Sequence, residues 1–271
     1  MPQLSRRRLV VAVAAVAAPV VIGVGAFVVQ QPASAGPGEY VAMGDSYAAG
    51  LGTRVYDSGS GDCKRSPRAY APIDAARIGA TLTFVACSGA EVSDVVDSQV
   101  RALDAATTWV TVQVGGNDAG FADVLTECAL PWWASDCAGA VADARDIITD
   151  TLPGRLDGLY DQISARAPSA EVVVVGYPRL FNGEDCNAGT FFSPDDERLL
   201  NQGADLLNST ISDVADSHGF DFVDPTADFA GHAVCDDPEW INGLSNPIRE
   251  SYHPTRAGPQ AYADLVDDHL D

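Results

Sequence analysis

Four residues of the types that acyl transfer requires follow predicted strands or precede the last predicted helix. Ser46 closes the segment Gly44-Asp45-Ser46 behind an apolar run, Gly89 and Asn117 follow the next two β-branched runs, and His253 precedes a proline. A serine hydroxyl is a weak nucleophile until an adjacent base such as histidine takes its proton. The developing oxyanion needs fixed donors, which the amides of Ser46 and Gly89 and the side chain of Asn117 offer. This set predicts a serine ester hydrolase with Ser46 as nucleophile and His253 as base.

Each of these residues also has a purely structural interpretation. Asp45 and Ser46 could serve merely as helix caps, Gly89 could relieve a tight turn, and Asn117 could be a turn or N-cap residue. Among the four histidines, His253 alone has an acid, Glu250, three residues before it and a proline after it. The occurrence of all four residues in order, at successive strand ends, favours the catalytic interpretation. Activity should then fall as the pH drops through the pKa of the histidine, which is about 6.5 when unperturbed.

The elements that must position these residues alternate along the chain. Short β-branched runs predict five strands, at 40–43, 81–86, 109–114, 171–175 and 220–223. Helical spacing predicts helices at 68–78, 91–103, 119–126, 139–167, 194–218 and 257–270. Such alternation implies right-handed crossovers and a mainly parallel sheet, so we expect one three-layer α/β/α domain over residues 36–271. Ligands bind such folds beyond the carboxyl ends of the strands, where the four residues would meet.

The first 35 residues are typical of a secretory signal peptide. Arg6-Arg7-Arg8 precedes an apolar run over 9–29, and Ala33-Ser34-Ala35 forms an A-x-A cleavage site. An uncleaved membrane anchor is the alternative, because the run is about long enough to span a bilayer. We favour cleavage after Ala35, which predicts an extracellular protein without a membrane anchor.

The net charge of the chain excludes some partners. Cleavage would leave 13 of the 16 basic residues against 38 acidic ones, a balance of −25. A surface of this charge repels nucleic acids and anionic membranes. The remaining candidate partners are small or lipid ester substrates.

Six cysteines are predicted to form three disulfides, because an even number in an exported chain is typical of a disulfide framework. They are Cys63, Cys87, Cys128, Cys137, Cys186 and Cys235. Spacing alone leaves the pairing open, and the simplest arrangement joins neighbours, as 63–87, 128–137 and 186–235. A zinc site is disfavoured because the chain has no C-x-x-C or paired Cys/His spacing, and no other metal is indicated.

The four blocks resemble those of the SGNH/GDSL hydrolase superfamily. Gly44-Asp45-Ser46 with Gly50 is similar to its first block, Gly89 to its second, Gly115-Gly116-Asn117-Asp118 to its third, and His253-Pro254 to its last. The disulfide layout and the signal peptide resemble the secreted actinobacterial lipase/esterase branch. The resemblance covers about residues 38–271 and implies a flavodoxin-like fold, hydrolysis of carboxylic esters, no cofactor and a monomer. An α/β-hydrolase is disfavoured because the chain has no G-x-S-x-G motif.

Glu250 is the one departure from that pattern, because the superfamily usually has aspartate three residues before the histidine. The third member of such a relay orients the imidazole and stabilises the imidazolium. Either the Glu250 side chain or its backbone carbonyl could receive the His253 N–H. We slightly favour the carbonyl, because the extra methylene of glutamate misplaces a carboxylate at this position.

Trp132 and Trp133 form a conspicuous apolar pair in a predicted loop. They could pack over the edge of the sheet, or form a wall of an acyl-chain cleft or an interfacial contact. The leading interpretation is therefore a secreted lipase or carboxylesterase. The alternatives are a sugar-ester deacetylase, a phospholipase with the same site, and a secreted binding protein that has lost catalysis.

Overall fold

Five parallel strands form the sheet at the centre of the computed structural model, which describes residues 37–270. The strands are β1 (Glu39–Gly44), β2 (Thr81–Phe84), β3 (Thr107–Gln113), β4 (Glu171–Val175) and β5 (Asp221–Val223). Their order in the sheet is β2-β1-β3-β4-β5. The predicted α/β class and mainly parallel five-stranded sheet are therefore confirmed. This order reverses direction between β1 and β3, and open α/β sheets bind ligands at such a switch point.

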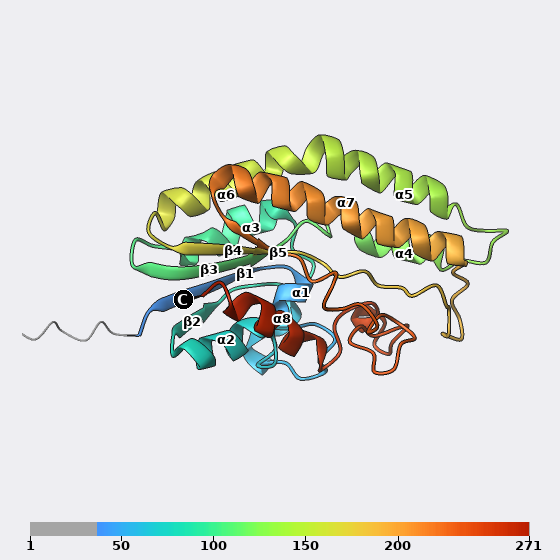
Figure 1. Cartoon of the computed structure of the whole chain (residues 1–271), viewed down its shortest axis with the longest axis horizontal. Coiled ribbons are helices and arrows are strands. Elements are labelled where there is room, and N and C mark those ends of the chain that lie inside the picture. The colour runs from blue at the N-terminus through green and yellow to red at the C-terminus, as the bar shows by residue number, and fades with distance from the viewer. Residues whose placement is uncertain (1–36, 271) are drawn as a thin grey trace, which may run out of the picture. The chain divides into compact units, whose positions relative to one another are not determined.

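Helices cover both faces of the sheet and make the three layers that the sequence predicts (Figure 1). One face carries α2 (Tyr70–Ile78) and α8 (Gly258–Asp267). The other carries α3 (Val92–Ser98), α6 (Leu152–Arg166) and α7 (Pro194–His218). The core lies in these two interfaces, and four consecutive buried valines, Val172–Val175, show why β4 is covered on both sides.

The helix predicted over 139–167 is divided. It begins as α5 (Cys137–Asp146), passes through a π-helical turn at Ile147–Thr151, and continues as α6 with Pro153 in its first turn. Proline has no N–H to donate, so it is accommodated where the helical hydrogen bonding is already interrupted. The helix predicted over 91–103 likewise ends at Ser98 and continues as a 3-10 turn over Gln99–Ala102.

Three disulfides join neighbouring cysteines: Cys63–Cys87, Cys128–Cys137 and Cys186–Cys235. The first ties the segment after α1 (Ser46–Ala49) to the loop after β2. The second closes the connection between α4 (Phe121–Cys128) and α5. Each cross-link stabilises the fold mainly by restricting the unfolded chain.

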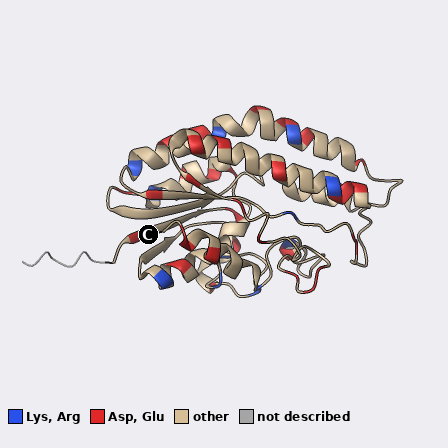
Figure 2. Ribbon diagram, in the orientation of Figure 1, with Lys and Arg blue, Asp and Glu red and all other residues tan. Residues whose placement is uncertain are grey.

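The predicted signal peptide lies outside the described residues. Within residues 37–270, no helix is long and apolar enough to cross a bilayer. Acidic residues outnumber basic ones on the outer helices (Figure 2), in keeping with the net charge of the whole chain, −22.

Candidate active site

Ser46 stands at the start of the four-residue helix α1, directly beyond the carboxyl end of β1. Gly44 has φ 134°, and a Cβ there would lie 2.2 Å from the carbonyl oxygen of Gln113 on the adjacent strand β3, so only glycine fits. Asp45 then caps the helix, since its Oδ1 accepts a hydrogen bond of 2.9 Å from the Tyr47 N–H. The capping residue and Ser46 are therefore adjacent, so the capping interpretation holds for Asp45 and leaves the Ser46 side chain free for another role.

His253 lies against Ser46, although 207 residues separate them in sequence. Its Nε2 is 2.7 Å from Ser46 Oγ, and its Nδ1 is 2.8 Å from the backbone carbonyl oxygen of Ser251. A carbonyl can only accept, so the ring proton is on Nδ1 and Nε2 accepts the Ser46 O–H. This arrangement is that of a hydroxyl poised to lose its proton to a neutral imidazole.

Burial favours the neutral form of this imidazole. Desolvation lowers the pKa of His253 to about 4, and the hydrogen bond to the Ser251 carbonyl acts in the opposite direction. The ring is therefore unprotonated at neutral pH, as a general base must be.

The structure differs from the sequence prediction at Glu250. The carbonyl that receives the His253 N–H belongs to Ser251, two residues before the histidine rather than three. Glu250 ends a 3-10 turn, and Tyr252 has a left-handed backbone with φ 59°, which redirects the chain between the turn and the histidine. Neither the side chain nor the carbonyl of Glu250 is the partner of the imidazole.

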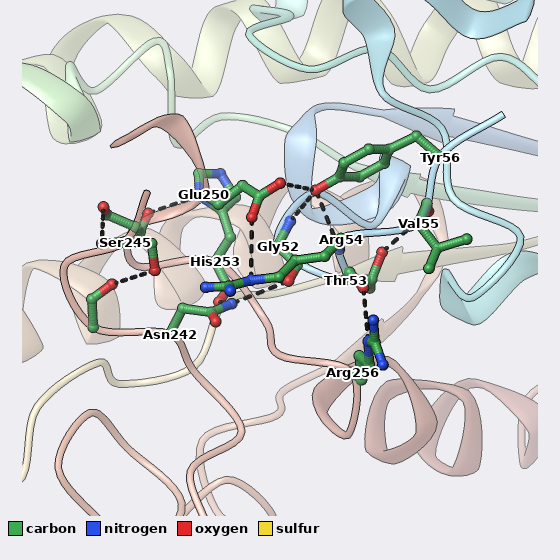
Figure 3. Close-up of polar contacts among 12 residues, drawn as sticks. Gly52, Thr53, Arg54, Val55, Tyr56, Asn242, Ser245, Glu250, His253 and Arg256 are labelled. Carbon is green, nitrogen blue, oxygen red and sulfur yellow. Dashed lines mark hydrogen bonds and ion pairs between the residues drawn. The ribbon is translucent and has the colours of Figure 1, made fainter. Parts of the chain in front are cut away.

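The Glu250 carboxylate instead joins two segments of the site (Figure 3). Its Oε1 accepts a hydrogen bond of 2.7 Å from the Tyr56 hydroxyl, and its Oε2 lies 3.4 Å from Arg54 Nε. The Tyr56 hydroxyl also accepts the Gly52 N–H at 3.1 Å, and a Cβ on Gly52 would lie 3.0 Å from His253 Cβ. Glu250 thus holds the segment that packs behind the histidine.

Glu250→Ala is therefore expected to lower kcat by less than about tenfold, because the side chain does not touch the imidazole. The free energy of unfolding should fall by about 1 kcal/mol, since the half-buried Tyr56 hydroxyl loses its acceptor. Steady-state kinetics at neutral pH and urea unfolding measure the two effects. Tyr56→Phe, which removes the same hydrogen bond from the other side, is the matched control. A kcat loss as large as that of Ser46→Ala would contradict this assignment.

Asn117 lines the same cavity as Ser46 and is joined by a hydrogen bond to the loop after β2 that contains Gly89. Asn117 Nδ2 donates to the Ala90 carbonyl oxygen at 2.9 Å, and Gly89 directly precedes Ala90. The carbonyl occupies one N–H of the Asn117 amide and so fixes the direction of the other. Gly89 has φ 84°, a left-handed conformation that favours glycine whatever its chemical role.

Two tyrosines that were not predicted as site residues connect these loops. Tyr177, just after β4, donates to Asp45 Oδ2 at 2.6 Å and accepts the Gly116 N–H at 3.3 Å. Tyr47 donates to the Tyr252 carbonyl oxygen at 2.6 Å. Burial raises the pKa of Asp45 to about 7, and the hydrogen bond from Tyr177 opposes this shift. The only feature of the sequence that could have identified Tyr177 as a site residue is its position at the carboxyl end of a strand.

An apolar cavity opens from Ser46 and Asn117 and runs between α4, α5 and α7. It is lined by small and aliphatic side chains, including Val124, Leu125, Val141, Ile148, Leu200, Ala204 and Leu207. A cavity of this lining accommodates a hydrocarbon chain. Trp132 and Trp133 do not line this cavity, and their exposed fractions are 87% and 72%, so a place in the cleft wall gains no support. Held in the short α4–α5 connection, they point outward.

Comparisons with known proteins agree with this fold. Residues 42–261 match the GDSL-like lipase/acylhydrolase family. Lipase 1 of Streptomyces coelicolor is 44% identical over 231 residues, which is 84% of each chain. The crystal structure of phospholipase A1 from Streptomyces albidoflavus NA297 has a TM-score of 0.82 and 45% identity, covering 86% of this chain and 99% of that one. That of an extracellular lipase from Streptomyces rimosus has a TM-score of 0.81 and 42% identity over the same shares.

Proposed function

The chain belongs to the GDSL-like lipase/acylhydrolase family and is a carboxylic ester hydrolase, and from this premise we propose that Ser46 and His253 cleave lipid esters through an acyl-enzyme. The observation that carries the proposal is the 2.7 Å approach of Ser46 Oγ to an Nε2 whose ring proton is held on Nδ1. The relay is a dyad, completed by the backbone carbonyl of Ser251.

Acylation begins when His253 Nε2 takes the Ser46 proton and Oγ attacks the ester carbonyl carbon. The carbonyl oxygen becomes an oxyanion, which receives hydrogen bonds from the backbone N–H groups of Ser46 and Gly89 and from Asn117 Nδ2. The Ser251 carbonyl stabilises the imidazolium that forms. As the C–O bond to the alcohol breaks, Nε2 returns the proton to the leaving oxygen.

Deacylation repeats these steps with water. His253 takes a proton from the water, whose oxygen attacks the acyl carbon, and the same donors hold the second oxyanion. The bond to Ser46 Oγ then breaks, Oγ regains its proton from Nε2, and the carboxylic acid leaves.

The apolar cavity supports a lipid acyl chain as the acid part of the substrate. It begins at Ser46 and is lined almost entirely by carbon. An acetyl group fills little of such a cavity, whereas each buried methylene of a longer chain contributes about 0.8 kcal/mol. This lining favours a lipase over a deacetylase of sugar esters. The phospholipase A1 activity named for one relative makes phospholipids the second candidate substrate.

Narrowing this cavity is expected to change acyl-chain preference. Ala204 lines it from α7, and Ala204→Trp should lower kcat/KM for a dodecanoyl ester by about tenfold or more, since several methylenes lose their place. The value for an acetyl ester should stay within about twofold. A chain-length panel of p-nitrophenyl esters measures both. Gln202→Trp, at an exposed position of the same helix, is the control. An equal decrease of kcat/KM at every chain length would show that the acyl chain binds outside this cavity.

The acidic limb of the pH profile should lie near pH 4 rather than pH 6.5. Catalysis needs neutral His253, whose pKa burial lowers to about 4, so kcat falls as the pH drops through that value. Between the unfolded pKa of about 6.5 and the folded value, the unfolded state binds more protons, so stability also declines towards acid. Circular dichroism at each pH separates loss of base from unfolding. A half-maximal kcat at pH 6.5 in folded enzyme would contradict the burial of the imidazole.

We further propose that residues 1–35 are a signal peptide removed after Ala35, and that residues 36–271 act outside the cell as a monomer without a membrane anchor. The basic and apolar segments and the A-x-A site support export. The three disulfides also favour an oxidising compartment.

A further inference from the structure

Four large apolar side chains are exposed in or beside the connection between α4 and α5. They are Leu130, Trp132, Trp133 and Phe191, with exposed fractions of 37%, 87%, 72% and 56%. Phe191 comes from the segment before α7, and its N–H donates to the Ala129 carbonyl oxygen at 3.2 Å, which joins that segment to the connection. We call these four residues the tryptophan patch. Large apolar side chains that gather at one exposed place are typical of a contact surface.

The fold holds the tryptophan patch outward. The Cys128–Cys137 disulfide closes the base of the connection. Within it, Ser135 Oγ donates to the Glu127 carbonyl oxygen at 2.9 Å, and the Asp136 N–H donates to Glu127 Oε1 at 2.6 Å. These bonds fix both ends of a short loop, so the exposure of Trp132 and Trp133 is built into the structure.

The tryptophan patch lies where the two helices α4 and α5, which line the cavity, are connected. Val124 and Leu125 on α4 and Val141 on α5 line the acyl cavity, and the patch residues from 130 to 133 lie in the connection between these two helices. Figure 1 shows this connection projecting at the same end of the molecule as the segment before α7. A surface that the patch touches would therefore lie beside the helices that enclose the substrate chain.

The chemistry of the tryptophan patch selects its partner. Residues 129–135 contain no charged side chain, whereas the whole chain carries −22. Tryptophan prefers the boundary between lipid headgroups and acyl chains, where its ring is buried and its N–H can find an acceptor. The overall negative charge repels an anionic bilayer. We propose that the tryptophan patch docks the enzyme on a zwitterionic phospholipid surface, an inference that rests on lipid esters being the substrate.

Binding of the inactive Ser46→Ala protein to phosphatidylcholine vesicles tests this docking without hydrolysis. Co-sedimentation should give a Kd that rises by about tenfold or more when Trp132→Ala and Trp133→Ala are added. The protein with both tryptophans should show a blue shift of its emission on vesicles, and the variant, which keeps Trp109 and Trp240, should not. Ile248→Ala removes an apolar side chain that is 69% exposed in the 3-10 turn before Ser251, and it should leave the Kd unchanged.

Three results would overturn the docking proposal. They are an unchanged Kd in the double tryptophan variant, an equal loss in Ile248→Ala, and a protein that dimerises through the patch and ignores vesicles. Hydrolysis of a soluble acetyl ester by the double tryptophan variant with Ser46 intact separates this test from that of the proposed function. The variant should hydrolyse this ester at the rate of the parent protein. If the parent protein did not hydrolyse the ester, the proposed function would be contradicted, whereas the vesicle binding result would be unaffected.

Discussion

Ser46→Ala is expected to lower kcat for a soluble ester by about 10⁴-fold or more, while the fold is retained. The substitution removes the only atom that can form the acyl-enzyme in the proposed mechanism. His253 would keep its place, because the hydrogen bond from Nδ1 to the Ser251 carbonyl does not involve the serine. Steady-state kinetics of the purified variant measure the loss, and a thermal melt close to that of the parent checks the fold.

The control for this substitution is Ser98→Ala. Ser98 ends α3, and its hydroxyl donates to the Asp94 carbonyl oxygen on the surface, away from the cavity, so kcat should not change. The double variant Ser46→Ala, His253→Ala should be no slower than Ser46→Ala alone, because the two residues act as one unit. If Ser46→Ala kept a tenth of the parent kcat, the nucleophile would be another group.

Asn117→Ala is expected to lower kcat by about 100- to 1,000-fold with little change in KM. Loss of one oxyanion donor has an effect of this size, because the donor acts on charge that develops only in the transition state. The Ala90 carbonyl holds the amide at 2.9 Å, so the direction of its second N–H is set before substrate binds. Kinetics with a short-chain ester, which depends little on the apolar cavity, isolate the effect.

Asn117→Asp extends this test. It keeps the shape of the side chain but places a carboxylate oxygen against the Ala90 carbonyl and removes the donor, so its kcat should be at least as low as that of Asn117→Ala. Asn182→Ala, which removes an exposed amide that donates to Asp236, is the control and should be neutral. A rise in KM at unchanged kcat would instead assign Asn117 to substrate binding.

Much of the fold and the meeting of the main site residues could be predicted from residue pattern. Short β-branched runs separated by helical runs indicate parallel strands, and the four valines of β4 indicate a strand covered on both faces. Ser46 and Asn117 follow β1 and β3, which are neighbours at the switch point of the sheet. Their proximity therefore follows from topology. The resemblance to the SGNH/GDSL superfamily is confirmed by the family match and by relatives at 44% identity.

The contacts that the sequence could not reveal depend on backbone direction and distant partners. The Ser251 carbonyl faces the imidazole because of the conformation at Tyr252, which no spacing rule specifies. Glu250 meets Tyr56 across 194 residues. The sequence around Trp132 and Trp133 would be the same in a cavity wall as at an exposed tip. An irregular loop has no periodicity from which the direction of its side chains could be predicted.

The most direct test of the mechanism is labelling of the protein with an organophosphate, followed by peptide mapping in a mass spectrometer. Such reagents phosphorylate an activated serine hydroxyl and leave ordinary serines unmodified. We expect one label per molecule, on the peptide that contains Ser46, with activity lost in proportion to labelling, and no label on Ser46→Ala. A label on any other residue, or an equal yield in Ser46→Ala, would contradict the assignment of Ser46 as the nucleophile.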